Sequence, residues 1–115
     1  MIRTIPMKIY ISLPITGYDL QERKRYAESV KKRLQQIYTD SEIITPFDVN
    51  PDPTPPYDEL MKRCLVALNN CDAVYFCKGW KESRGCMIEQ EAAIAHCKYV
   101  LLRTYYQDLL IDIEP

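Results

Sequence analysis

Four short apolar segments alternate with three longer stretches of mixed polar and apolar residues along the chain. The short segments span residues 7–12, 42–45, 73–77 and 98–103. The first of them is rich in β-branched and aromatic residues and is followed by the breakers Pro14 and Gly17. This pattern is typical of a buried strand and is too short for a surface helix. We therefore predict four strands, separated by the longer stretches.

The longer stretches repeat apolar residues at helical spacing. Such patterns cover residues 19–38 and 57–68, and a third opens at Gly85. In the first helix, Asp19 is the expected N-cap, and Glu22 stands three residues later, where it would complete a capping box. The face that we expect to pack on the sheet carries Tyr26, Val30, Leu34 and Ile37.

The connection at residues 46–56 contains five prolines, two aspartates and one asparagine. Because proline lacks a backbone N–H and clashes with the preceding turn, this sequence predicts neither a helix nor an inner strand. A loop of this length in a compact domain usually has a functional reason. Since it directly follows the second predicted strand, we expect it beside the carboxyl edge of the sheet.

The element order β-α-β-α-β-α-β predicts a single domain over residues 1–115. Alternating strands and helices imply a parallel sheet with right-handed crossovers and helices on both faces. We thus predict a three-layer α/β/α fold, flavodoxin-like or Rossmann-like, with four to five strands. Residues 8–12, 73–77 and 99–102 should form adjacent parallel strands, and the tail 104–115 should add an edge strand or a last turn.

Ligands bind such sheets beyond the carboxyl ends of the strands, at the point where the strand order reverses. Three connections are expected to meet there: the turn 12–17, the proline-rich connection 46–56 and the turn 79–89. The third connection leads from a strand through Gly79 and Trp80, the only tryptophan, into a helix N-terminus, where free N–H groups favour an anion. We therefore look for functional residues in these connections.

The overall composition argues against nucleic-acid and membrane partners. The chain is 47% hydrophobic and 27% charged, with a formal net charge of -1. Its basic cluster has helical spacing and is predicted to be a solvated helix face: Arg23, Lys24, Arg25, Lys31, Lys32 and Arg33. No apolar run approaches the roughly 20 residues of a membrane span, and no signal peptide is recognisable at the N-terminus. We expect a cytoplasmic protein.

The cysteines are expected to be reduced, buried and structural. Five are present, an odd number without any C-x-x-C pair: Cys64, Cys71, Cys77, Cys86 and Cys97. The only histidine, His96, has no partner at metal-ligand spacing beyond its neighbour Cys97. We expect neither a metal nor a cofactor.

Two glutamates near the start of the third helix are candidates for chemistry. The helix dipole favours their ionised form, and residue periodicity does not choose between Glu89 and Glu91. Both are alternatively solvated acids of the first turns. Ser83 is expected to cap this helix or to contact a ligand phosphate.

Three further residues have more than one interpretation each. Asp72, just before the third strand, is either a buried cap acceptor or part of the site. Tyr10 lies in the middle of a strand, where a core role is more usual than a functional one. Trp80 is a lid, a stacking platform or a side chain packed on the sheet edge.

Taken together, several motifs resemble the nucleoside 2-deoxyribosyltransferase-like superfamily. These are MKIYIS with LPITG, then CDAVYF, then GWKESRGCMIEQEAAIAHCK. The resemblance covers residues 8 to about 102. It is greatest to a small branch of uncharacterised domains with a G-W-x-x-S-x-G-x-x-x-E signature.

The resemblance implies that Glu89, rather than Glu91, is the nucleophile that attacks the anomeric carbon of a 2-deoxyribosyl group and releases the base. It implies catalytic support from Asp72 and Tyr10. Ser83 matches a phosphate-contacting serine of the nucleotide-hydrolysing branch, which favours a 5′-phosphate on the ligand. The implied substrate-binding residues are Ser12, Thr16, Gly17, Asp48, Gly79, Trp80, Ser83 and Gly85.

Two departures from the family pattern support an alternative. Cys64 stands where the family usually carries a base-binding aspartate, and the first loop keeps only Gly17 of the glycines and arginine typical of the hydrolase branch. The alternative is a nucleotide-binding protein without turnover on the same scaffold. In both cases the ligand is a nucleoside or nucleotide, and the family implies a homodimer or higher homo-oligomer, with the aromatic pair Tyr105 and Tyr106 as a candidate contact.

Overall fold

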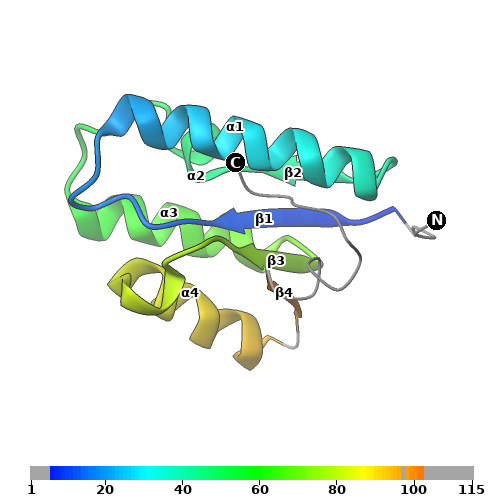
Figure 1. The fold of residues 1–115 in the computed structure, drawn as a ribbon. Helices are drawn as coiled ribbons and strands as arrows, with labels where there is room; N and C mark the ends of the chain where they lie inside the picture. Colours follow the sequence, from blue (N-terminus) through cyan, green and yellow to red (C-terminus); the bar gives the residue numbers. More distant parts are fainter. Residues whose placement is uncertain (1–5, 97, 103–115) are drawn as a thin grey trace.

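The computed structural model describes residues 6–96 and 98–102, and these form a four-stranded parallel sheet covered by helices (Figure 1). The strands are β1 (Lys8–Ser12), β2 (Glu42–Ile44), β3 (Ala73–Phe76) and β4 (Tyr99–Leu102), in the order β2-β1-β3-β4. All three pairings are parallel. The prediction of a three-layer α/β fold with β1, β3 and β4 adjacent is confirmed. The predicted contribution of residues 104–115 lies outside the described residues.

The helices divide between the two faces of the sheet (Figure 1). Helix α1 (Leu20–Ile37) covers one face, and α3 (Tyr57–Asn69) and α4 (Arg84–Ala95) cover the other. Because the chain moves to one side of β1 through α1 and to the other side through α3, the strand order reverses beside β1. The crevice expected at such a reversal lies at the carboxyl ends of β1 and β3.

Strand β1 contributes to both faces because successive side chains of a strand point in opposite directions. Ile9 and Ile11 pack with residues of α1, whereas Tyr10 packs with residues of α3 and α4. From Ile9 to Ser12 the strand is fully buried, as the sequence predicts for a central strand. The strand therefore builds a core and also carries polar groups into it.

Helix α1 begins as predicted, with one correction about its charges. The Asp19 carboxylate accepts the Glu22 N–H (2.9 Å), but the Glu22 carboxylate pairs with Arg23 (2.6 Å) in place of the expected capping-box bond. The prediction that the whole basic set is solvated is wrong for Arg23, which is only 8% exposed. Its guanidinium contacts the rings of both Tyr18 and Tyr26, which help to cover it from water.

The proline-rich connection begins with a short helix, α2 (Pro46–Val49), so the prediction that it contains no helix is wrong for these residues. Thr45 accepts the Asp48 N–H (3.1 Å) and donates its own N–H to the Asp48 carboxylate (2.9 Å), which makes a capping box. Pro46 occupies the first turn, where a backbone N–H would have no acceptor within the helix, so its absence costs nothing. Because Thr45 acts as the cap, β2 ends one residue earlier than predicted.

The turn between β3 and α4 contains one 3₁₀ turn, η1 (Trp80–Glu82), preceded by Gly79 in the left-handed region (φ 86°). Ser83 caps α4 by accepting the Cys86 N–H (3.2 Å), as the sequence predicts. Cys64, Cys71, Cys77 and Cys86 are buried free thiols, and Cys97 lies outside the described residues. None of the described helices has both the length and the apolar character needed to span a membrane.

Candidate functional site

Glu89 is a buried carboxylate held by two hydroxyl groups of the central strand. It is 5% exposed, and it lies on the face of α4 turned to the sheet. The Ser12 hydroxyl donates to Oε1 and the Tyr10 hydroxyl donates to Oε2, both at 2.6 Å. Glu91, by contrast, is exposed. The structure thus separates the two candidate glutamates that residue periodicity left equivalent.

Burial raises the pKa of Glu89 to about 7, although the hydrogen bonds from Ser12 and Tyr10 act in the opposite direction. This reverses the expectation that the helix dipole keeps the carboxylate ionised. Glu89 is the sixth residue of α4, beyond the first turn in which the dipole acts most strongly. A carboxyl group with this pKa exists in both protonation states near neutral pH, as general acids and bases require.

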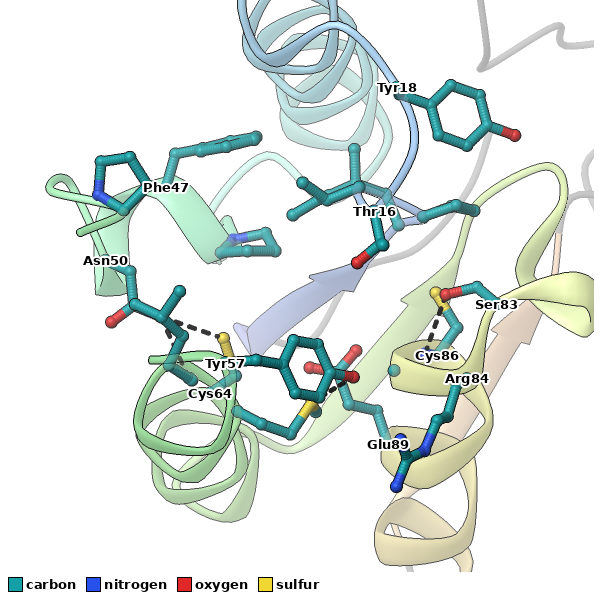
Figure 2. A pocket seen from close by; sticks show the side chains of 18 of the residues that line it. Thr16, Tyr18, Phe47, Asn50, Tyr57, Cys64, Ser83, Arg84, Cys86 and Glu89 are labelled. Atoms are coloured by element: carbon teal, nitrogen blue, oxygen red, sulfur yellow. Dashed lines mark hydrogen bonds between the residues drawn. The ribbon is translucent and has the colours of Figure 1, made fainter. Parts of the chain in front are cut away.

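A cavity of about 670 Å³ opens beside Glu89 at the carboxyl edge of the sheet. Figure 2 shows Glu89 reaching into it from α4, with Tyr57 and Cys64 of α3 on one side and Cys86 on the other. Thr16 of the first loop and Phe47 of α2 line it as well. The expectation that residues 46–56 lie beside this edge is confirmed, because the cavity is also lined by Pro46, Asn50, Pro51 and Pro53. A cavity of this size suits a ligand of nucleoside or nucleotide dimensions.

The thiols next to Glu89 extend its polar network. Cys64 and Cys86 line the cavity together with Glu89, and Cys64 accepts a hydrogen bond from Asn50 (3.4 Å). Burial raises the pKa of both thiols to about 11. They are therefore protonated at neutral pH and are poor nucleophiles.

Asn50 links the proline-rich connection to Cys64 on α3. Its Nδ2 donates to the Leu60 carbonyl (3.1 Å) and to the Cys64 sulfur (3.4 Å). Its Oδ1 is buried and accepts no hydrogen bond from the described residues. Reasoning from sequence missed Asn50, because an asparagine in a proline-rich connection reads as an ordinary turn residue.

Most of the predicted site residues are brought together. Six of them line the cavity: Tyr10, Thr16, Gly79, Ser83, Gly85 and Glu89. Ser12 does not line the cavity, but it contacts Glu89 directly. Gly85 permits a close approach between helices, since a Cβ at this position would lie 3.2 Å from the Tyr57 hydroxyl oxygen. Ser83 is both the helix cap and a lining residue, so its two readings are compatible.

Besides Ser12, four predicted residues are not among those that line the cavity. Asp72 lies at the amino end of β3, at the opposite edge of the sheet, where its carboxylate accepts the Lys8 N–H (2.9 Å). Asp48 caps α2 and pairs with Lys31 (3.2 Å). Trp80 packs on Phe76, with ring centroids 5.2 Å apart. Gly17 shapes the first loop with a positive φ of 88°.

Aromatic and basic side chains at the cavity were also missed by the sequence reasoning. Phe47, Tyr18 and Tyr57 line it, together with Lys24 and Arg84. The ammonium group of Lys24 lies 5.9 Å from the centre of the Phe47 ring. These five side chains come from five separate segments and share no motif, so only the fold reveals their proximity. Among residues 6–96 and 98–102, no cluster of three or more His, Cys, Asp or Glu residues has the arrangement of a metal site.

Comparison with known proteins identifies one family. The profile of a family described as a domain of unknown function, DUF4406, matches residues 7–102, which is most of the chain. No curated protein matches.

Proposed function

The chain belongs to the DUF4406 family, and we propose that it is an enzyme that cleaves or exchanges the N-glycosidic bond of a deoxynucleoside or its 5′-monophosphate. The observation that carries the proposal is the buried Glu89 carboxylate, which opens into a nucleotide-sized cavity between two hydroxyl donors. The likeness of its sequence motifs to the nucleoside 2-deoxyribosyltransferase-like superfamily supports the same reaction.

In the proposed reaction, a Glu89 oxygen attacks the anomeric carbon and the C–N bond breaks, so that its electron pair leaves with the base. The departing base, which carries this electron pair, takes up a proton from solvent. Water, or a second base, then attacks the same carbon, displaces the carboxylate and loses its proton to solvent. Tyr10 and Ser12 hold the carboxylate in position, and each Glu89 oxygen accepts only one of these two bonds, which leaves a lone pair for attack.

The cavity supplies complementary groups for a nucleotide. Phe47 and Tyr57 offer aromatic surface for a planar base, and Lys24 and Arg84 offer positive charge for a phosphate. The cap residue Ser83 lies at the N-terminus of α4, which favours an anion. These features support a 5′-monophosphate over an uncharged nucleoside.

The test is base release from a panel of deoxynucleosides and their 5′-monophosphates, followed by chromatography. Glu89→Gln keeps the shape of the side chain but removes the nucleophile, so the release rate should fall by at least about 10³-fold. Glu91→Gln is the matched control on the same helix and should retain the wild-type rate. Equal rates in the wild type and Glu89→Gln would refute the enzyme.

The pH dependence of the rate tests the role assigned to Glu89. A nucleophile must be ionised, so release should increase as pH rises through about 7. A decrease over the same range would instead identify Glu89 as a general acid.

A second candidate is a nucleotide-binding protein without turnover. Its supporting observation is Cys64, an un-ionised thiol of the cavity lining that accepts a hydrogen bond from Asn50 and stands where the superfamily usually has a carboxylate. Slow base release that is identical in the wild type and Glu89→Gln, together with nucleotide binding by both, would establish this function.

We also propose that the protein acts in the cytoplasm as a homodimer or higher homo-oligomer. The buried free thiols support a reducing compartment, and the oligomer is implied by the superfamily. Light scattering at micromolar concentration tests the oligomer, and a monomer mass would exclude it.

A further inference from the structure

Arg23 is a buried cation that makes three kinds of contact at once. On one edge of its guanidinium, Nε and Nη2 donate to the two Glu22 carboxylate oxygens at 2.6 and 2.7 Å. On the other edge, Nη1 donates to the Pro14 carbonyl at 3.3 Å. The rings of Tyr18 and Tyr26 lie over it, with centroids 4.3 and 4.5 Å from Cζ. A planar, delocalised cation with donors on two edges is needed for all of these contacts together.

Two of these partners belong to the first loop, residues 13–18, and both line the cavity that holds Glu89. Figure 2 shows Tyr18 at the end of this loop, with Thr16 beside the cavity. The same two partners also meet the turn before α4, since a Cβ at Gly79 would lie 3.5 Å from Pro14 Cγ and 3.8 Å from the Tyr18 hydroxyl oxygen. Arg23 itself is not among the lining residues.

Inside the loop, the Tyr18 N–H donates to the Ile15 carbonyl (3.1 Å), and contacts from outside the loop add to this bond. Gly17 adopts a positive φ of 88°, and a Cβ built there would meet no atom within 4 Å. The side of Gly17 on which a Cβ would stand is therefore open, and glycine reaches this φ at little cost. If the loop adopts its binding-competent conformation in only a fraction of the molecules, the apparent ligand affinity is reduced in proportion to that fraction.

We infer that Arg23 is a positioning residue for the ligand site: it ties the first loop to α1 and so holds Pro14 and Tyr18 in place as one wall of the cavity. The inference rests on the proposed function only in assigning a nucleotide to that cavity.

Arg23→Lys tests the anchor. Lysine keeps the charge but has no second edge and no planar face, so the contacts to Pro14 and Tyr18 should not form together. Amide hydrogen exchange of residues 15–18 should be about tenfold faster than in the wild type, while exchange in β1 should stay the same. Arg25→Lys is the matched control, because Arg25 is exposed on the same helix. Unchanged exchange in the loop of Arg23→Lys would overturn the inference.

Binding of the four 2′-deoxyribonucleoside 5′-monophosphates, measured by calorimetry, tests the consequence for the site. For the nucleotide that binds most tightly, Arg23→Lys should raise Kd about tenfold and leave kcat within about twofold. An unchanged Kd would overturn the positioning role. If the wild type binds none of the four, the assignment of a nucleotide to the cavity fails, and the exchange experiment alone decides the role of Arg23.

Glu22→Gln provides a second variant that does not remove the cation. The Glu22 side chain is 43% exposed, so the variant should fold. It keeps one hydrogen bond to Arg23 but loses the opposite charge, and loop exchange and Kd should change in the same direction by a smaller factor. Faster exchange in Arg23→Lys with no change in Glu22→Gln would support the anchor by Arg23 and would overturn the contribution of Glu22 to it.

Discussion

The two faces of the sheet use the same strand in different ways. Toward α1, β1 presents Ile9 and Ile11, and the core there is built mainly from aliphatic side chains. Toward α3 and α4, the same strand presents Tyr10 and Ser12, which hold the buried Glu89. One face therefore stabilises the fold through hydrophobic burial, and the other contains an ionisable group in surroundings that disfavour its charge.

The largest effect on stability should come from a cavity in the aliphatic face. Leu34 is fully buried there, and Leu34→Ala should lower the free energy of unfolding by about 2–5 kcal/mol. Urea denaturation measures the loss, with the exposed Gln35→Ala as control. Nucleotide affinity at low temperature should stay near the wild-type value. A loss of binding free energy as large as the loss of unfolding free energy would show that the two faces are not independent.

The next effect depends on pH and arises on the other face. The pKa of Glu89 is about 7 in the folded protein, against 4.5 as the ordinary value. The folded state therefore binds a proton that the unfolded state has released. This stabilisation is complete below about pH 4.5 and is lost as pH rises through about 7, a change of roughly 3 kcal/mol.

Glu89→Gln should remove this pH dependence, because glutamine does not titrate. Urea denaturation at pH 5 and at pH 8.5 should show the variant gaining stability relative to the wild type at the higher pH. Parallel pH dependences in the two proteins would show that Glu89 does not titrate near neutrality.

A smaller effect is expected from the hydroxyl of Tyr10. Tyr10→Phe removes one donor that stabilises the ionised Glu89, so the pKa of Glu89 should rise by about one unit. The midpoint of the pH-dependent stability change should move upward by the same amount. Tyr57→Phe is the control, since its hydroxyl lies against the Met61 sulfur (3.7 Å) and does not bond to Glu89. A midpoint that stays in place in Tyr10→Phe would contradict the role of this bond.

Most of the fold was predictable from sequence because its signals are local. Alternating apolar segments and helical periodicity located the four strands and three long helices, and Asp19 and Ser83 marked two helix starts. The short helix α2 was missed because proline was read as a breaker, although Thr45 and Asp48 could have signalled a capping box before it. Local signals therefore fail mainly where one residue type has two positional meanings.

The site was only partly predictable because it is built from contacts distant in sequence. The strand–loop–helix motif singled out Glu89, but its partners Tyr10 and Ser12 stand 79 and 77 residues earlier. The raised pKa of Glu89 and the burial of Arg23 both depend on the surrounding packing, which no sequence spacing encodes. Asp72 was placed in the site on resemblance, whereas its contact with Lys8 lies at the other edge of the sheet.

The long distance in sequence between Glu89 and its partners Tyr10 and Ser12 also affects how the protein folds during synthesis. During synthesis, β1, α1 and β2 emerge first and can assemble around the aliphatic face. At that stage Glu89 has not yet been synthesised, so the Tyr10 and Ser12 hydroxyl groups lack their carboxylate partner. Within residues 6–96 and 98–102, α4 is the last long helix to be synthesised, and its docking carries Glu89 out of water. Because the neutral carboxylic acid is less costly to dehydrate than the carboxylate, this final docking step should be faster in mildly acidic solution than in alkaline solution.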